Sequence, residues 1–168
     1  MSKGELVKLE IRPVLKPGDV LLYASKGWIA WVIKTKTWSD INHTETYLGD
    51  ELSAASRDGL GVDTYPTRWE GLKYVLRPQS TIDLAAGALW HKSVCKQGYD
   101  WLGLLASFFS QKGGSSTKMF CSEHTARLAQ RFGYFPFGSA YDCDKVSPGM
   151  FKASPVYDLV WSVKQTKS

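Results

Sequence analysis

The sequence has few cysteines, no long apolar run and no apolar leader. Its three cysteines, Cys95, Cys121 and Cys143, are an odd number at wide spacing, which argues against a disulfide framework and leaves at least one thiol free. No stretch approaches the ~18 consecutive apolar residues of a membrane-spanning helix. The N-terminus leads into mixed polar sequence without the apolar segment of a signal peptide. We therefore expect no membrane span, no signal peptide and a reducing, cytoplasmic setting.

The sequence also lacks a basic run, although its formal net charge is +5. Lysines and arginines are scattered singly, and no basic stretch interleaves with aromatic residues as in a nucleic-acid groove. We expect no nucleic-acid partner. A solvated, slightly basic surface is the simpler interpretation, and an anionic partner such as cell-wall polymer or lipid headgroups is the alternative.

The 168 residues fit one domain, residues 1–168, and a hydrophobic content of 43% is enough for a core. Strand character dominates from Asp19 to Pro78, and helical character dominates from Asp83 to Gly133. No repeat or long linker separates the two parts. We therefore expect a single α+β domain.

Short strands are predicted at 20–23, 41–49, 52–55, 61–65, 73–76 and 156–163, while residues 28–34 fit either helical turns or a strand. The segment 41–49 alternates, which places His43, Glu45 and Tyr47 on one face. Helices are predicted from Asp83, as N-cap, to about residue 97 with Gly98 at the end, then over 99–110, and from 121 to 132 with Gly133 at the end.

Cys121 stands at the predicted start of the last of these helices. A helix N-terminus presents unpaired N–H groups and a partial positive charge, which favour a thiolate over a thiol. The same N–H groups can hold an oxyanion that develops on an attacked carbonyl. The position therefore suits a nucleophile, although a small buried cysteine at a helix start is the structural alternative.

His43 is the histidine best placed to act as a base for a thiol. Glu45 lies two residues on, hence on the same face of the strand, where it can accept a hydrogen bond from the imidazole ring. His91 and His124 are weaker candidates. Cys121, His124 and Cys143 could suggest zinc, but a second tight ligand pair is missing, so we expect no metal and no cofactor.

Five motifs follow one another along the chain: PGDVLLY at 17–23, NHTETYLGD at 42–50, LSAAS at 52–56 followed by GVDTY at 61–65, YDWLG at 99–103, and MFCSE at 119–123. The residues of these motifs and their order along the chain resemble the circularly permuted NlpC branch of papain-like cysteine hydrolases, which also contains YiiX-like and lecithin retinol acyltransferase-like proteins. The histidine precedes the cysteine, as is typical of that branch. The resemblance spans about residues 13–155, and the motif sequences are similar to those of small phage and prophage members.

The resemblance implies a permuted papain-like fold of the α+β class, with a small antiparallel sheet or partial barrel packed against helices. It implies Cys121 as nucleophile, His43 as base and a third polar residue on the following strand. Ser53 occupies the place where NlpC-type enzymes usually carry an orienting residue such as histidine. Serine orients an imidazole more weakly than a carboxylate does, so we prefer Glu45 for this role. By analogy, Tyr23 is a helper at the oxyanion.

Three functions stay open on this basis. The first is a cysteine hydrolase that cleaves amide bonds, such as those of cell-wall peptide, through a thioester. The second keeps the thioester but acts on a lipid or ester acyl group. The third is a non-catalytic phage structural or binding module, which the serine at position 53 favours. The expected partners are a peptide or acyl substrate, with cell-wall polymer or phage virion proteins as further candidates, and a virion-associated location is the alternative to the cytoplasm.

Overall fold

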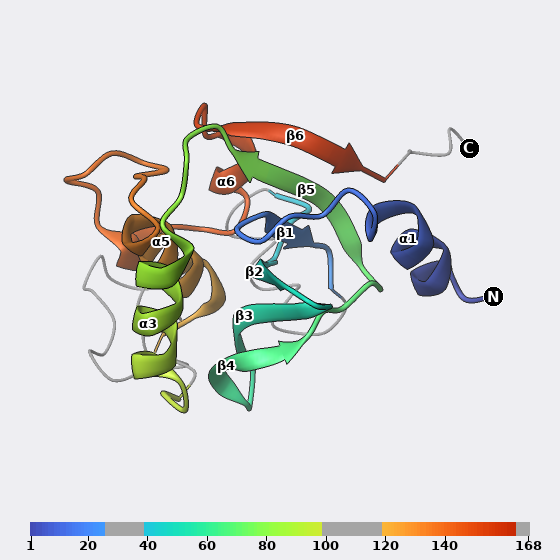
Figure 1. Cartoon of the computed structure of the whole chain (residues 1–168), viewed down its shortest axis with the longest axis horizontal. Helices are drawn as coiled ribbons and strands as arrows, with labels where there is room; N and C mark the ends of the chain where they lie inside the picture. The colour runs from blue at the N-terminus through green and yellow to red at the C-terminus, as the bar shows by residue number, and fades with distance from the viewer. Residues whose placement is uncertain (26–38, 99–118, 164–168) are drawn as a thin grey trace.

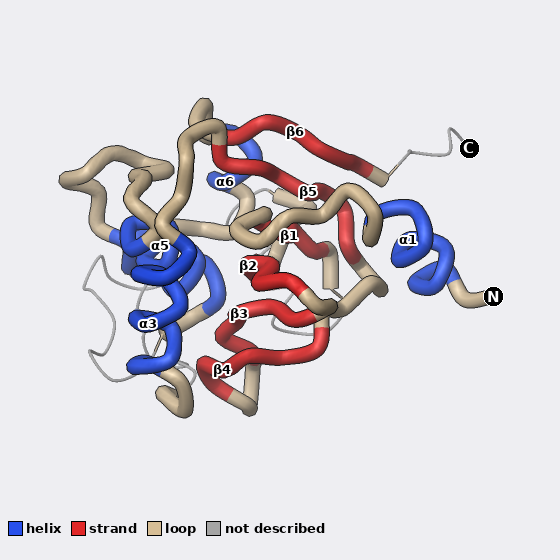
Figure 2. The backbone as a smooth tube through the Cα atoms, viewed as in Figure 1, coloured by secondary structure: helices blue, strands red, loops and turns tan. Residues whose placement is uncertain are grey.

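The centre of the fold is a six-stranded antiparallel sheet in the order β4-β3-β2-β1-β5-β6 (Figures 1 and 2). The computed structural model describes residues 1–25, 39–98 and 119–163. The predictions for 28–34 and for a helix over 99–110 lie outside these ranges. The strands are β1 (Val20–Tyr23), β2 (His43–Gly49), β3 (Leu52–Arg57), β4 (Gly61–Pro66), β5 (Leu72–Pro78) and β6 (Tyr157–Ser162). The α+β class and the predicted strands in the described ranges are thereby confirmed.

The two faces of the sheet are covered by different helices. On one face, α5 (Cys121–Arg131) packs on β2 and β3, and α3 (Leu84–Val94) packs on α5 and β4. On the other face, α1 (Lys3–Ile11) inserts Val7 and Ile11 into an apolar cluster with residues of the central strands. Figure 1 shows α3 and α5 at the opposite side of the molecule from α1.

The central strands are buried on both faces, and their side chains alternate between two cores. Val20 and Leu22 of β1 join the core beneath α5, whereas Leu21 and Tyr23 join the core beneath α1. Tyr23 pairs with His43 across the strands, and paired residues point to the same face. The predicted alternation of β2 is therefore confirmed: His43 lies on the α1 side of the sheet.

The helix ends follow the predictions in part. Asp83 caps α3 by accepting a hydrogen bond from the N–H of Ala86, and α5 ends just before Gly133, whose φ is +94°. However, α3 ends at Val94 rather than near residue 97. The chain leaves the helix there because the backbone of residues 96 and 97 forms two hydrogen bonds with Val62 at the edge strand β4.

Three helical segments were not predicted. For α1, Ser2 and Glu5 form a reciprocal capping box, a local signal that the sequence carries at its start. The other two, η1 (Cys143–Lys145) and α6 (Met150–Ala153), span three and four residues, too few for a periodic pattern. Within the described part of the chain, no helix is long and apolar enough to cross a membrane.

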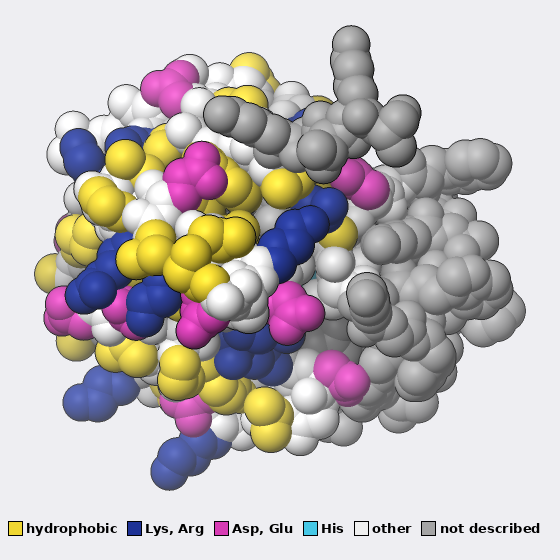
Figure 3. Space-filling view, turned by 90° about the vertical axis from the view of Figure 1, so that its right-hand side faces the viewer, with side chains coloured by type: hydrophobic (Ala, Val, Ile, Leu, Met, Phe, Trp, Pro, Cys, Tyr) yellow, Lys and Arg dark blue, Asp and Glu magenta, His cyan; other side chains and the backbone are white. Residues whose placement is uncertain are grey.

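The surface charges are mixed on the face that carries α1. Figure 3 shows lysine and arginine side chains there interspersed with aspartate, glutamate and hydrophobic side chains. Neither sign of charge dominates this view. The described part of this face therefore carries both signs of charge and no continuous basic patch.

Candidate active site

Cys121 is the first residue of α5, as predicted. Its N-cap, Phe120, is extended and offers no side-chain acceptor, and the first intrahelical donor is the N–H of His124, 3.0 Å from the Phe120 carbonyl oxygen. The earlier N–H groups of the helix are therefore free for other acceptors. The backbone N–H groups of Ser122 and Thr44 lie close enough to the Cys121 sulfur to lower the pKa of the thiol.

Three hydrogen bonds of hydroxyl groups hold this end of α5 against its surroundings. Thr125 Oγ1 lies 3.0 Å from Thr44 Oγ1 of β2. Ser122 donates to the Val146 carbonyl oxygen at 2.5 Å, and Ser56 of β3 donates to the carbonyl oxygen of Met119 at the same distance. Because these hydroxyls are buried, the start of the helix is held close to the first residues of β2.

His43, the first residue of β2, lies between Cys121 and Glu45. Its Nε2 is 3.0 Å from Glu45 Oε1, and the Cys121 thiol is close enough to the ring to raise the pKa of His43. With Nε2 facing the carboxylate, Nδ1 is the nitrogen available to the sulfur. The structure thus brings together the three residues Cys121, His43 and Glu45, although the cysteine lies far along the chain from the other two.

The electrostatics of the pair favour charge separation. Burial raises the pKa of the Cys121 thiol, but the charge and hydrogen bond of His43 and the N–H groups of Thr44 and Ser122 lower it more, so the net pKa falls below its usual value. Burial lowers the pKa of His43, but Cys121 and Glu45 raise it more. Both shifts favour a thiolate facing an imidazolium, which is the activated form of a cysteine nucleophile.

Glu45 is fully buried and is held ionised by cations. Arg57 donates to it through Nε at 2.9 Å and through Nη2 at 3.1 Å, and Arg68 Nη2 lies 3.2 Å from Oε1. Burial raises the pKa of this carboxyl, but His43 and the two arginines lower it to about 2. The sequence analysis missed both arginines, because they come from β3 and from the turn before β5, and no local spacing links them to Glu45.

Tyr23 and Ser53 are the two other residues that the resemblance singles out. The Tyr23 hydroxyl donates to the Arg68 carbonyl oxygen at 3.0 Å and lies 3.5 Å from Glu45 Oε2, so it supports the carboxylate. Ser53 pairs with Tyr47 across the strands, and its Oγ lies 2.8 Å from Thr67 Oγ1. Between the two candidate orienting residues, the geometry favours Glu45, because it contacts the imidazole directly.

The other two histidines form a network of their own. His91 Nδ1 lies 3.1 Å from His124 Nε2, and His91 Nε2 lies 3.0 Å from Thr64 Oγ1. Trp90 stacks on His124 with ring centroids 5.6 Å apart. Burial and the neighbouring His91 lower the pKa of His124 to about 3, so this ring is neutral at physiological pH.

Comparison with known proteins supports the fold and does not extend to a family. No protein-family model matches the chain, and no curated protein matches it. Among solved structures, it is similar to the metalloprotein YiiX from Escherichia coli O157:H7, with 18% identity and a TM-score of 0.64 over 88% of this chain and 97% of that one. In the described part of the present chain, no group of three or more His, Cys, Asp or Glu side chains is arranged to hold a metal ion. At this level of identity the similarity concerns architecture, and the chain shares the fold of YiiX.

Proposed function

We propose that this protein is a cysteine hydrolase with a permuted papain-like, NlpC-type fold that cleaves amide bonds through a thioester acyl-enzyme. Cys121 is the nucleophile, His43 the general base and Glu45 the residue that orients the imidazole. The observation that carries the proposal is that a thiol at a helix N-terminus and an imidazole lie close enough to shift each other's pKa, while a buried carboxylate lies 3.0 Å from one ring nitrogen of that imidazole. This is the arrangement that nucleophilic catalysis by cysteine requires.

In the proposed reaction, the Cys121 thiolate attacks the carbonyl carbon and forms a carbon–sulfur bond. N–H groups at the start of α5 stabilise the oxyanion. The His43 imidazolium then gives its proton to the leaving nitrogen as the carbon–nitrogen bond breaks. A water molecule, deprotonated by the neutral imidazole, attacks the thioester and releases the acid, and the proton on His43 restores the ion pair.

The lowered pKa of the Cys121 thiol supports this function over a non-catalytic module, which requires no activated cysteine. The peptide substrate is the class that the sequence resemblance implies. A lipid or ester acyl group would use the same thioester, so the substrate is tested separately from the nucleophile.

The test of the nucleophile is acylation by an activated ester such as p-nitrophenyl acetate, followed by intact mass. We expect one acyl group on the wild-type protein and on Cys143→Ala, a matched control that removes another buried thiol, and none on Cys121→Ala. Acylation that persists in Cys121→Ala, or a wild-type protein that stays unmodified, would refute the assignment.

The test of the substrate uses the same three proteins with a muropeptide and with a neutral acyl ester. Release of a new amine from the muropeptide, lost in Cys121→Ala, is the expected result. Turnover of the ester alone would indicate that the substrate is a lipid or ester acyl group and not a peptide.

A further inference from the structure

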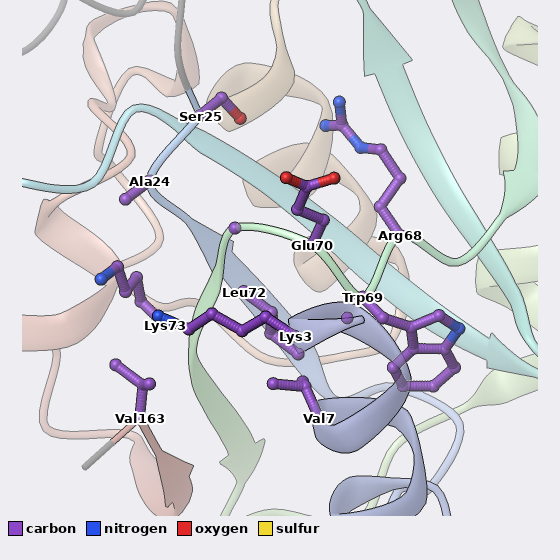
Figure 4. Close-up of a pocket in the computed structure, with 12 residues that line it drawn as sticks. Lys3, Val7, Ala24, Ser25, Arg68, Trp69, Glu70, Leu72, Lys73 and Val163 are labelled. Carbon is purple, nitrogen blue, oxygen red and sulfur yellow. The ribbon is translucent and has the colours of Figure 1, made fainter. Parts of the chain in front are cut away.

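A pocket of about 470 Å³ opens on the α1 side of the sheet (Figure 4). This volume lies within the range of small-ligand sites, about 300–1,000 Å³. The first turn of α1, the end of β1 and the turn that leads into β5 form its walls. Gly71 shapes that turn: its φ is +78°, and an added Cβ would come within 3.3 Å of the Ala24 carbonyl oxygen.

The lining combines an apolar floor with a rim of charged side chains: three cations, Lys3, Lys73 and Arg68, and one carboxylate, Glu70. Val7 and Leu72 are buried side chains that line the pocket, and Trp69 forms one wall. Figure 4 shows the Lys3 and Lys73 side chains ending on the same side of the pocket, opposite Trp69.

Neither lysine forms an ion pair among the described residues. Lys8, which lies on the same helix as Lys3, pairs with Glu51, whereas none of the ion pairs in the described part of the chain involves Lys3 or Lys73. Because the lining holds three cations and one carboxylate, its positive charges are in excess, and this excess favours an anion in the pocket.

The pocket adjoins the candidate catalytic residues through two direct contacts. Arg68 lines the pocket and also lies 3.2 Å from Glu45 Oε1. Ser25 lines it as well, and its backbone N–H and carbonyl oxygen both hydrogen-bond the side chain of Asn42, the residue before His43. A ligand here would therefore touch the wall that positions Glu45 and His43.

We propose that this pocket binds an anionic oxygen group, phosphate or carboxylate, on the substrate that Cys121 attacks, with Lys3 and Lys73 as its counter-ions and the apolar floor receiving the adjacent carbon chain. The inference rests on the proposed function and narrows its substrate to acyl compounds that carry a negative charge close to the scissile bond.

The first test measures anion binding without catalysis. Inorganic phosphate and acetate are titrated separately into the Cys121→Ala protein at constant ionic strength, and ¹H–¹⁵N spectra are recorded. We expect saturable shifts of the Gly4 and Gly71 amides and of the Trp69 indole with at least one anion. The tighter anion identifies whether phosphate or carboxylate is preferred. Phosphate carries up to two charges and acetate one, so a preference for phosphate indicates that both ammonium groups are used.

The matched variants are Lys3→Gln/Lys73→Gln and Lys92→Gln, each carrying Cys121→Ala. Lys92 is exposed on α3, at the opposite side of the molecule. The double variant should bind the anion about tenfold more weakly, while Lys92→Gln should bind as well as its parent. An unchanged spectrum outside the variant sites reports that the fold is intact. Absence of saturable shifts with both anions, or equal affinity in the double variant and its parent, would overturn the proposal.

The second test links the pocket to the reaction, using proteins with Cys121 intact. Mono-p-nitrophenyl succinate is compared with p-nitrophenyl butyrate, a neutral ester of similar length. We expect a higher kcat/KM for the anionic ester, about a tenfold loss of this preference in Lys3→Gln/Lys73→Gln, and an unchanged rate on the neutral ester. Equal preference in the variant and the wild type would contradict a role in substrate binding. If neither ester acylates Cys121, the proposed function fails, and the anion titration still decides whether the pocket is a binding site.

Discussion

At the scale of single residues, the site is a row of ionisable groups. The Cys121 thiol faces the His43 ring, the ring faces the Glu45 carboxylate, and the carboxylate faces Arg57 and Arg68. Cys121, His43 and Glu45 are buried and Arg57 is nearly so, whereas 40% of the Arg68 side chain is exposed. Because an unpaired buried charge costs several kcal/mol, the members of this row depend on one another.

The role of Glu45 can be separated from that of Ser53 by two substitutions. Glu45→Gln should lower kcat/KM about 10²–10⁴-fold, because the amide cannot stabilise the imidazolium as a carboxylate does. It should also lower the free energy of unfolding by about 3–5 kcal/mol, because Arg57 loses its buried counter-ion. Ser53→Ala should leave kcat/KM within about threefold of the wild type, since Ser53 contacts Thr67 and not the imidazole. Activity assays and urea unfolding of both variants provide the measurement. The reverse ranking of the two kcat/KM values would assign the orienting role to Ser53.

At the scale of elements, the site depends on the docking of α5 against β2. The Thr44–Thr125 hydrogen bond is the side-chain link between these elements closest to Cys121 and His43 along the chain, and both hydroxyls are buried. Neither element holds the site alone: β2 supplies the imidazole and the carboxylate, and α5 supplies the thiol and the N–H groups.

Substitution of these threonines by valine tests this link. Thr44→Val or Thr125→Val alone should lower the free energy of unfolding by about 1–3 kcal/mol, because the remaining hydroxyl stays buried without its partner. The double variant should recover most of this loss, because both polar groups are then replaced by methyl groups of similar shape. Chemical unfolding of the four proteins gives the coupling energy. Additive losses in the double variant would show that the hydrogen bond does not join the two elements.

At the scale of the whole molecule, a second buried carboxyl group determines part of the pH dependence of stability. Glu123 of α5 is 2% exposed and lies with Asp144 around Arg127, whose Nε and Nη2 donate to them at 2.9 Å and 2.7 Å. Burial and the neighbouring Asp144 raise the pKa of Glu123 to about 8, more than Arg127 lowers it. This carboxyl is therefore protonated in the folded protein at neutral pH.

Ionisation of Glu123 makes the stability depend on pH, because the folded and the unfolded protein lose this proton at different pH values. The unfolded chain releases the proton near the ordinary glutamate pKa of 4.5 and the folded protein near 8, so this group makes the free energy of unfolding fall as the pH rises between these values. Glu123→Gln mimics the protonated form and should flatten this part of the profile, by a few kcal/mol between the two ends. Unfolding free energies measured from pH 4 to 9 provide the test, with the exposed Glu10→Gln as control. A wild-type slope that persists in Glu123→Gln would exclude Glu123 as its source.

The predictions succeeded for most segments with a local pattern, although the capping box at the start of α1 was missed. The alternation of β2 placed His43 and Glu45 on one face, and the N-cap Asp83 marked the start of α3. The predictions failed where a contact with a distant segment decides the local structure. At the end of α3, for example, the chain leaves the helix because its backbone pairs with Val62. For the same reason, the two arginines that contact Glu45 were not predicted. Arg57 and Arg68 reach Glu45 only because the fold brings β3 and the turn before β5 close to β2.

By itself, the sequence specified the α+β class, the strands in the described ranges, the starts of α3 and α5, and the candidate pair Cys121 and His43, because periodicity, capping and residue type act over a few neighbouring positions. Only the tertiary structure decided that thiol, imidazole and carboxylate meet, that Glu45 rather than Ser53 touches the imidazole, and that Lys3 and Lys73 share a pocket beside them. The physical reason is that such contacts depend on strand register and on helix docking, which bring together residues that the chain keeps far apart.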